Sequence, residues 1–113
     1  MPSCIFCKIL AKQAPAKIVH EDESCVAFHD LHPQAPVHLL VIPRKHFSST
    51  EETEQTDEPV LGHLYRVAAK LAQQYGITDG YRMVVNAGAG AGQSVFHFHM
   101  HVLGGRAFRW PPG

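Results

Sequence analysis

The spacing of apolar residues along the chain predicts two helices of unequal length. Over residues 59–76 apolar positions recur every three or four residues, as they do on the buried face of an amphipathic helix. Pro59 suits the first helical position, and Gly76 suits the left-handed residue that follows the last turn. Residues 3–11 predict a shorter helix with Ser3 as its N-cap. The residues expected to face the core are Val60, Leu61, Leu64, Val67, Ala68, Leu71, Ala72 and Tyr75 in the long helix, and Ile5, Phe6, Ile9 and Leu10 in the short one.

Shorter apolar segments between turn residues predict about five strands. Most of these segments follow one another closely, which favours an antiparallel sheet backed by helices, an α+β fold. The segment VHLLVIP, residues 37–43, is apolar at almost every position and is therefore expected to be covered on both faces. Residues 48–58 are acidic and polar without periodicity, and they predict a loop. The other expected strands are residues 16–21, 24–30 and 81–87 and the segment that begins at His97.

Composition and charge narrow the class of protein. A chain of 113 residues with 45% apolar and 18% charged residues fits one globular domain, residues 1–113. Ten basic and ten acidic side chains cancel, and the basic residues form no stripe that would bind a nucleic-acid backbone. The N-terminus is too short and too polar for a signal peptide, and no apolar segment is long enough to cross a membrane. We therefore expect a soluble, cytoplasmic protein that binds neither nucleic acid nor membranes.

The segment HFHMHVL, residues 97–103, carries the strongest chemical signal. Side chains alternate between faces along a strand, so His97, His99 and His101 are expected on one face and the apolar residues between them on the other. Inert, hydrogen-bonded histidines are one interpretation, and a single histidine would favour it. A metal site is another, but the first and third α-carbons would be roughly 13 Å apart, which strains a shared ion. We favour catalysis, because a neutral imidazole can attack phosphorus while its neighbours donate to phosphate oxygens.

The glycine-rich loop before this segment agrees with a phosphate pocket. The loop AGAGAGQS, residues 87–94, has no Gly-Lys-Ser/Thr ending, and a strand rather than a helix follows it, so it is neither a P-loop nor a dinucleotide fingerprint. Gly88, Gly90 and Gly92 would let main-chain amides approach an anion, and Ser94 adds a hydroxyl. Glycine clusters are more often plain turns, so the loop carries weight only together with the histidines.

The ordered set of motifs resembles the histidine triad superfamily and, within it, the Hint branch of histidine triad nucleotide-binding proteins. HFHMHVL fills every position of the pattern His–apolar–His–apolar–His–apolar–apolar. The similar stretches are CIFCKIL, FHDLHPQAPVHLLVIPRKH, GYRMVVNAG, GQSVFHFHMHVLGGR and the final WPPG. The resemblance implies an antiparallel sheet that continues into the sheet of a second subunit in a homodimer. It also implies hydrolysis of purine nucleoside 5′-phosphoramidates to the nucleoside monophosphate and an amine, with no required cofactor.

The resemblance further implies a role for each matching residue. His99 would be the nucleophile that takes the nucleotidyl group, and His101 would contact the phosphate and help the amine leave. His97 and His38 would complete the hydrogen-bonded set. Asp30 would accept hydrogen bonds from the ribose hydroxyls of the bound AMP or GMP moiety. The residues implied around the base are Phe28, His29 and Leu31, and those implied around the phosphate are Asn86, Gly92, Gln93 and Ser94.

Other interpretations stay open for three of these residues and for the function. Without the resemblance, Asp30 would be a turn former, Asn86 a strand-end cap and His38 a hydrogen-bonded core histidine. A related activity is hydrolysis of dinucleoside polyphosphates, against which the WPPG ending argues. A third reading is a nucleotide-binding regulatory protein whose catalysis is incidental.

Cys4 and Cys7 have the C-x2-C spacing that is common in zinc sites, although two ligands are too few for one. The chain holds three cysteines, and an odd number argues against a secreted disulfide framework. Some members of the wider superfamily complete such a site with a histidine after a basic pair and with the first triad histidine, which here are His46 and His97. A structural zinc on these four residues is therefore a hypothesis, although other Hint-like proteins lack the cysteines.

The final segment, RAFRWPPG, has Trp110 before two prolines, which excludes a helix or a central strand. An aromatic residue on a stiff tail suits docking onto a neighbour. The resemblance implies that this segment reaches toward the partner subunit's active site and affects substrate choice. The alternative is a tail that covers its own subunit.

Overall fold

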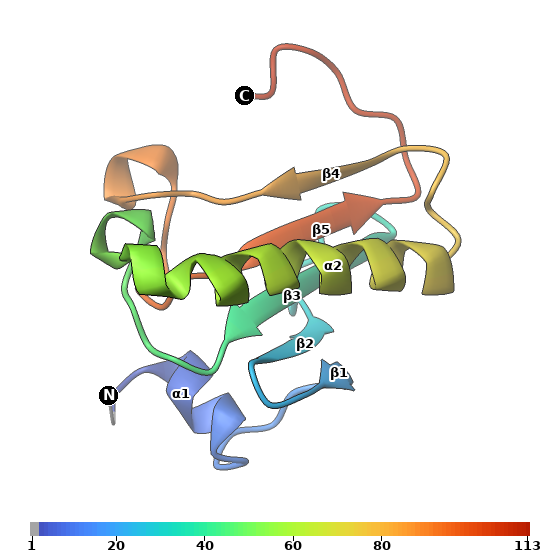
Figure 1. Cartoon of the computed structure of the whole chain (residues 1–113). Coiled ribbons are helices and arrows are strands. Elements are labelled where there is room, and N and C mark those ends of the chain that lie inside the picture. Colours follow the sequence, from blue (N-terminus) through green and yellow to red (C-terminus); the bar gives the residue numbers. More distant parts are fainter. Residues whose placement is uncertain (1–2) are drawn as a thin grey trace.

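The computed structural model describes residues 3–113, which form a five-stranded antiparallel sheet with a helix on each face (Figure 1). The strand order is β1-β2-β3-β5-β4, so β3 and β5 lie in the middle and β4 lies at one edge. This confirms the α+β fold with one long and one short helix. The elements are α1 (Ile5–Leu10), β1 (Ile18–Glu21), β2 (Cys25–His29), β3 (Val37–Pro43), η1 (Thr50–Glu52), η2 (Gln55–Asp57), α2 (Glu58–Gln74), β4 (Tyr81–Val84), η3 (Ala89–Ala91) and β5 (Met100–Gly104).

Helix α2 covers one face of the sheet and forms most of the core there (Figure 1). Its buried residues are five of those expected from the periodicity: Leu64, Val67, Ala68, Leu71 and Ala72. They pack against alternate residues of the central strands, among them Leu39, Val41, Met100 and Val102. The helix begins at Glu58, one residue before Pro59, and Gly76 has the expected positive φ of 69° after the last turn. The long helix was therefore predicted almost to the residue.

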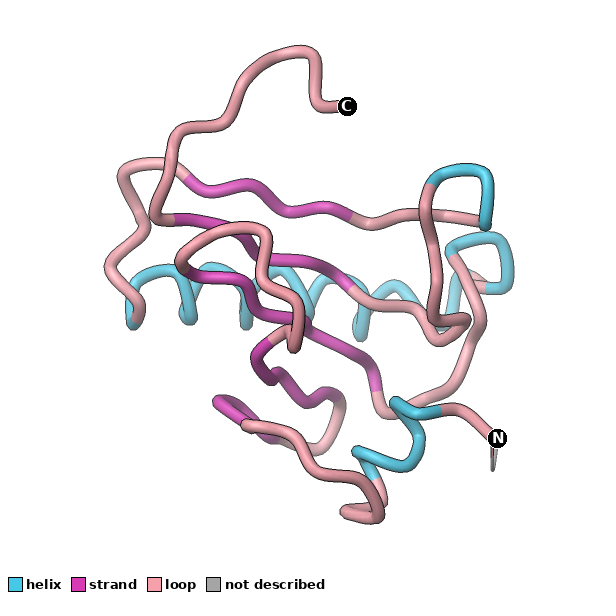
Figure 2. The backbone as a smooth tube through the Cα atoms, turned by 180° about the vertical axis from the view of Figure 1, so that it is seen from behind, coloured by secondary structure: helices cyan, strands magenta, loops and turns pink. Residues whose placement is uncertain are grey.

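Helix α1 covers part of the opposite face, which Figure 2 shows from behind. Phe6 and Ile9 pack there against Phe28, Leu40 and Ile42. Because Leu39 and Val41 face α2 while Leu40 and Ile42 face α1, strand β3 is covered on both faces, as its composition predicted. The N-cap is Cys4 rather than Ser3, since the Cys4 Sγ accepts a hydrogen bond of 3.3 Å from the Cys7 main-chain N–H.

The expected loop at residues 48–58 instead contains the two short helices η1 and η2 and the first residue of α2. Glu54 and Asp57 stabilise η2 through a reciprocal capping box, and Asp57 also accepts a hydrogen bond of 2.7 Å from Lys45. The capping box consists of local bonds between side chains and main chain, and the bond from Lys45 joins side chains 12 residues apart, so hydrophobic periodicity reveals neither. The fourth strand is shorter than residues 81–87, because only residues 81–84 pair with β5.

The histidine segment is a strand only from Met100 onward, which corrects the expectation of a strand beginning at His97. Its ladder with β3 starts at the pair Val41 and Met100. Beyond that pair, β3 ends at Pro43, which has no N–H to donate, and the Phe98 N–H bonds the Phe47 carbonyl at 2.8 Å instead. Phe98 still packs in the same core as Met100 and Val102, so the expected alternation of faces is kept. Among the described residues no helix is both long and apolar enough to span a bilayer.

Candidate active site

A cavity of about 320 Å³ opens on the face of the sheet that carries α1. Apolar residues of α1, β2 and β3 form one part of its wall, and polar residues from the end of β2, the glycine-rich loop and the histidine segment form the rest. Its volume lies at the lower end of the range of roughly 300–1,000 Å³ that is typical of small-molecule sites. The apolar residues include Ile5, Phe6, Ile9, Phe28, Leu31, Leu40 and Val95, and the polar ones include His29, Asp30, His32, Asn86, Ser94, His99 and His101.

His99 lies in the wall of this cavity, and a main-chain carbonyl determines which of its ring nitrogens carries the proton. Its Nδ1 lies 2.8 Å from the carbonyl oxygen of His97, and since a carbonyl only accepts, Nδ1 carries the proton. Nε2 is therefore the nitrogen with the lone pair. Burial lowers the pKa of His99, although the hydrogen bond to the His97 carbonyl opposes that shift, so the ring is neutral near pH 7. Phe6 packs edge-on against this ring at 5.2 Å between centroids.

A chain of hydrogen bonds fixes the neighbouring His101 in the opposite tautomer. The Gln34 N–H donates to Nδ1 of His38 at 3.0 Å, which leaves the His38 proton on Nε2. That Nε2 donates to Nδ1 of His101 at 2.8 Å, so His101 carries its own proton on Nε2. The ring of His101 lines the cavity beside His99, at 5.0 Å between centroids. Burial first, and then repulsion by His99 and His38, lowers the pKa of His101 to about 4.

Asp30 takes part in both the turn and the site. Its Oδ1 accepts the His32 N–H at 2.8 Å, which is the turn-forming role considered from sequence. Its Oδ2 lies 3.4 Å from Nε2 of His38, and the residue lines the cavity. Burial lowers the pKa of His38, with the charge of Asp30 opposing the shift. The carboxylate thus reaches the cavity and the histidine chain together.

His97 does not line the cavity with its two partners. Its ring is fully buried, and its Nε2 donates to the Pro43 carbonyl at 2.8 Å, which leaves the lone pair on Nδ1. That atom faces Cys4, Cys7 and His46, and we call these four residues the cysteine cluster. Burial lowers the pKa of His97 to about 4. Toward the cavity, His97 contributes its main-chain carbonyl, which orients His99.

The cysteine cluster brings together the four residues that were considered for zinc. One ligand atom from each lies within 4.8 Å of all the others. The Nδ1 atoms of His46 and His97 are 3.0 Å apart, and Sγ of Cys7 lies 3.3 Å from Nδ1 of His46. Two thiols and two imidazoles are a donor set that zinc prefers in closed, tetrahedral sites.

The remaining residues implied from sequence divide into two groups. Phe28, His29, Leu31, Asn86, Gly92 and Ser94 all line the cavity. Gln93 does not, because its buried side-chain amide donates to the carbonyls of Ser48 and Val95 and accepts the Gly88 N–H at 2.8 Å. Gly88 thus uses its amide inside the loop rather than toward an anion.

The apolar wall from α1 was not foreseen as part of the site. Phe6 and Ile9 were expected only in the core, yet both line the cavity together with Ile5. The sequence holds a weak signal for this apolar wall, because the helix is too short to bury the whole of its expected apolar face. Ile5 lies on that face and is 46% exposed.

Comparisons with known proteins agree with this arrangement. The model of the HIT domain family matches residues 11–108. A HIT-like protein of the cyanobacterium Synechocystis is 50% identical over 109 residues, which is 96% of each chain. The solved structure of a HIT family hydrolase from Legionella pneumophila has a TM-score of 0.96 and 46% identity, and the match covers 98% of this chain and 100% of that one.

Two further solved structures bear on ligands. A histidine triad nucleotide-binding protein from Candida albicans has a TM-score of 0.84 and 29% identity over 96% of this chain and 83% of its own. A zinc-bound histidine triad family protein from Mycobacterium smegmatis has a TM-score of 0.82 and 32% identity over 99% of this chain and 85% of its own. With its fold, its paired imidazoles and these matches taken together, the chain belongs to the HIT domain family.

Proposed function

We propose that this protein is a purine nucleoside phosphoramidase of the Hint type, which cleaves the P–N bond of nucleoside 5′-phosphoramidates. The observation that carries the proposal is the tautomer of His99. Its Nδ1 proton is held by the His97 carbonyl at 2.8 Å, so a neutral Nε2 lone pair belongs to a ring that lines the cavity. A nucleophile prepared in this way needs no separate base to deprotonate it.

The reaction then runs as a double displacement. Nε2 of His99 attacks phosphorus, the P–N bond breaks, and its electron pair stays on the amine nitrogen. The Nε2–H of His101, which the His38 chain places there, donates a hydrogen bond to the departing nitrogen, and that nitrogen takes its proton from a water molecule, because a neutral imidazole keeps its N–H near pH 7. The hydroxide left by that water attacks the nucleotidyl-His99 intermediate, which releases the nucleoside monophosphate and restores the neutral ring of His99.

The rest of the cavity suits the nucleotide portion of such a substrate. The apolar wall that includes Phe6, Ile9 and Phe28 offers a flat purine a surface to pack against. Asp30 places a carboxylate where two neighbouring ribose hydroxyls could donate to it. Ser94 and the main chain at Gly92 stand beside the histidines, on the side proposed for the phosphate.

Replacing His99 with alanine tests the nucleophile. We expect kcat for adenosine 5′-monophosphoramidate to fall on the order of 10⁴-fold or more, because the covalent route is lost. AMP binding, measured by calorimetry, and the thermal midpoint should change little and serve as the control for folding. Near-normal turnover in a folded His99→Ala protein would refute the assignment. A parallel panel of guanosine phosphoramidates and dinucleoside polyphosphates separates this activity from that of the related hydrolases.

We also propose that the cysteine cluster holds a structural zinc ion. Nδ1 of His46 and Nδ1 of His97 lie 3.0 Å apart, and the latter keeps its lone pair because Nε2 bonds Pro43. Two ring nitrogens at this distance either share a proton in a hydrogen bond or bind one cation together, and the two thiols beside them support the cation. Cys4 and Cys7 would supply the two thiolates. The ion would fix α1 and the histidine segment, while the proposed reaction uses only His99, His101 and water.

We propose, finally, that two chains form a homodimer through the outer edge of β4. Strand β4 pairs with β5 on one side only, and the other edge faces away from the sheet. Trp110 is 83% exposed and so does not cover its own subunit, which leaves it available to a neighbour. Unpaired strand edges of this kind are covered in native proteins, and a second copy of the sheet would cover this one.

A further inference from the structure

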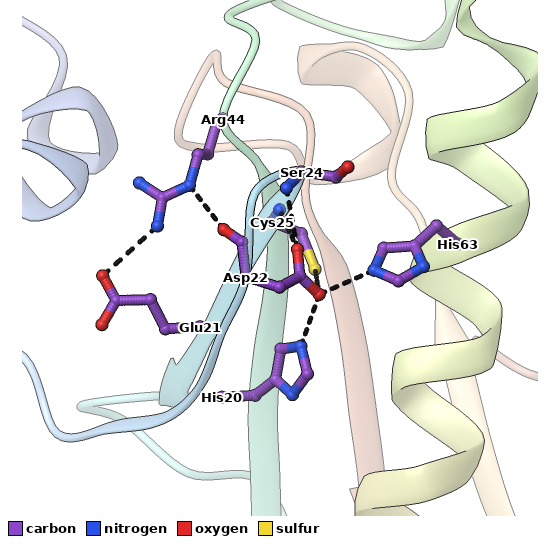
Figure 3. A network of polar contacts seen from close by, with 7 residues as sticks. All are labelled: His20, Glu21, Asp22, Ser24, Cys25, Arg44 and His63. Carbon is purple, nitrogen blue, oxygen red and sulfur yellow. Dashed lines mark hydrogen bonds and ion pairs between the residues drawn. The ribbon is translucent and has the colours of Figure 1, made fainter.

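Four side chains far from the cavity converge at the turn between β1 and β2 (Figure 3). They are His20, Asp22, Cys25 and His63, which we call the hairpin cluster. His20, Asp22 and Cys25 belong to the β1–β2 hairpin, whereas His63 comes from α2, across the face of the sheet. One ligand atom from each of the four lies within 4.8 Å of all the others. Neither the reaction nor the cysteine cluster uses any of these residues.

The convergence centres on a single carboxylate oxygen. Oδ2 of Asp22 lies 2.6 Å from Nε2 of His20, 2.7 Å from Nε2 of His63 and 3.6 Å from Sγ of Cys25. The three side-chain contacts on Oδ2 are not needed to form the turn between β1 and β2. The second oxygen, Oδ1, is already held by the N–H groups of Ser24 and Cys25 at 2.8 and 2.9 Å. Main-chain donors therefore orient the carboxylate and leave Oδ2 directed at the histidines.

The charges around the cluster permit a cation. Burial alone would raise the pKa of Asp22, but its N–H donors hold that pKa well below the ordinary value, so the group is an anion. The guanidinium of Arg44 is engaged outside the cluster: its Nε donates to the Asp22 carbonyl at 2.8 Å and its Nη2 to Glu21 at 3.2 Å (Figure 3). His63 also lines a surface hollow of about 600 Å³, which gives an ion a way in from solvent. The charged residues of this hollow are balanced in sign: Glu23, Asp57, Arg44 and Lys45.

We propose that the hairpin cluster is a second metal site that takes a zinc-like divalent cation through Nε2 of His20, an oxygen of Asp22, Sγ of Cys25 and Nε2 of His63. Two imidazoles, a carboxylate and a thiolate form a donor set of borderline softness that suits Zn²⁺ and Co²⁺ rather than Mg²⁺ or Ca²⁺. Tetrahedral bonds of about 2.0–2.3 Å separate ligand atoms by roughly 3.3–3.8 Å. The closest pairs in the cluster need to open by less than about 1 Å to reach that spacing.

Binding balances in protons as well as in charge. The ion replaces the Nε2 protons that His20 and His63 now donate to Asp22, and these protons move to Nδ1 of each ring by exchange with solvent. The Cys25 thiol releases its proton to solvent and binds as thiolate. The bound ion joins the β1–β2 hairpin to α2, two elements that lie apart in sequence, so its role is to hold the helix on the sheet.

Cobalt absorption can test the site directly in a chain from which the cysteine cluster has been removed. With Cys4→Ser and Cys7→Ser, Cys25 is the only thiol left among the three of the sequence. A thiolate-to-cobalt charge-transfer band in that protein therefore reports Cys25 alone. We expect the band to saturate at one Co²⁺ per chain. Adding His63→Ala should weaken Co²⁺ binding at least about 10-fold, and adding His32→Ala, an exposed histidine outside the cluster, should leave it unchanged.

The absence of this band from the folded double-serine protein, or its persistence at full strength with His63→Ala, overturns the proposal. A second measurement covers the case in which the double-serine protein does not fold, as judged by circular dichroism. Native mass spectrometry of the otherwise unaltered chain with Zn²⁺ should then count one ion fewer per chain in His63→Ala than in the wild type or in His32→Ala. Equal counts in all three proteins would likewise overturn it.

Discussion

Individual histidines in this protein differ in chemistry because each has a different partner on one ring nitrogen. In His99 a carbonyl accepts the proton of Nδ1, so the lone pair lies on Nε2. In His101 an imidazole donates to Nδ1, so Nε2 carries the proton. A carbonyl beside Nε2 turns the lone pair of His97 toward two cysteines. Three residues of one type, spaced two apart, therefore offer a nucleophile, a hydrogen-bond donor and a metal ligand. The division depends on the His97 carbonyl, the His38 ring and the Pro43 carbonyl, and the last two lie outside the triad.

The buried pair of His38 and His101 makes the stability of the fold depend on pH. Burial lowers both pKa values, that of His101 to about 4, while an unfolded histidine titrates near 6.5. Between about pH 6.5 and pH 4 the unfolded chain therefore takes up protons that the folded chain excludes. The contribution of these groups to the free energy of unfolding is complete above about pH 6.5 and is lost as the pH falls through that window.

Urea denaturation at pH 7 and pH 5, with a chelator present throughout, checks this expectation. The free energy of unfolding should be lower at pH 5, because burial also lowers the pKa of His97 and His99, and the loss should be smaller in His101→Gln, which removes one of these four histidines. Equal losses in the two proteins would show that His101 does not carry the effect.

At the level of elements, the sequence predicted what depends on periodicity and missed what depends on tertiary contact. The apolar repeat of α2 and the apolar run of β3 are properties of neighbouring residues, so both elements were found. The start of β5 at Met100 depends on where its partner β3 runs out of N–H donors, at Pro43, which lies 57 residues earlier. The placement of α1 over the cavity depends likewise on packing against β2 and β3. The motif resemblance located most of the cavity residues, but it could not show that Gln93 is used inside its own loop.

Zinc in the cysteine cluster would join α1 to the segment after β3 and to the histidine segment. At free zinc about a hundred times the dissociation constant, the ion contributes about 2.7 kcal/mol to folding, which is roughly 10 °C in the thermal midpoint of a domain this size. We expect zinc to raise the midpoint of chelator-treated wild type by that amount and that of Cys7→Ser much less. Atomic absorption on protein purified without added zinc should find the metal in the wild type. A wild type that binds none at this cluster would end the proposal.

At the scale of the whole molecule, the free edge of the sheet and the C-terminal tail lie together (Figure 1). Arg82 on β4 donates to the Arg109 carbonyl at 2.8 Å, and its guanidinium lies 5.1 Å from the ring centre of Phe108. Arg106 stacks on the same ring at 4.2 Å. These contacts fix the start of the tail beside β4, while Trp110 beyond them stays 83% exposed. One surface thus combines an unpaired strand with a large exposed aromatic side chain, the composition expected where another subunit binds.

A dimer built on this edge should be lost when a charge is placed in it. Met83 lies on β4 and is 38% exposed, so Met83→Lys would bury an unpaired ammonium group if a second β4 lay alongside. We expect light scattering at micromolar concentration to give twice the chain mass of 12.5 kDa for the wild type and a single chain for Met83→Lys. The matched control is Tyr65→Lys, which places the same charge at a 54% exposed aromatic position on α2, away from the edge, and should stay dimeric. If both substitutions dissociate the dimer, the added charge and not its position on β4 explains the effect. If the wild-type protein scatters light as a single chain, the proposed dimer is wrong.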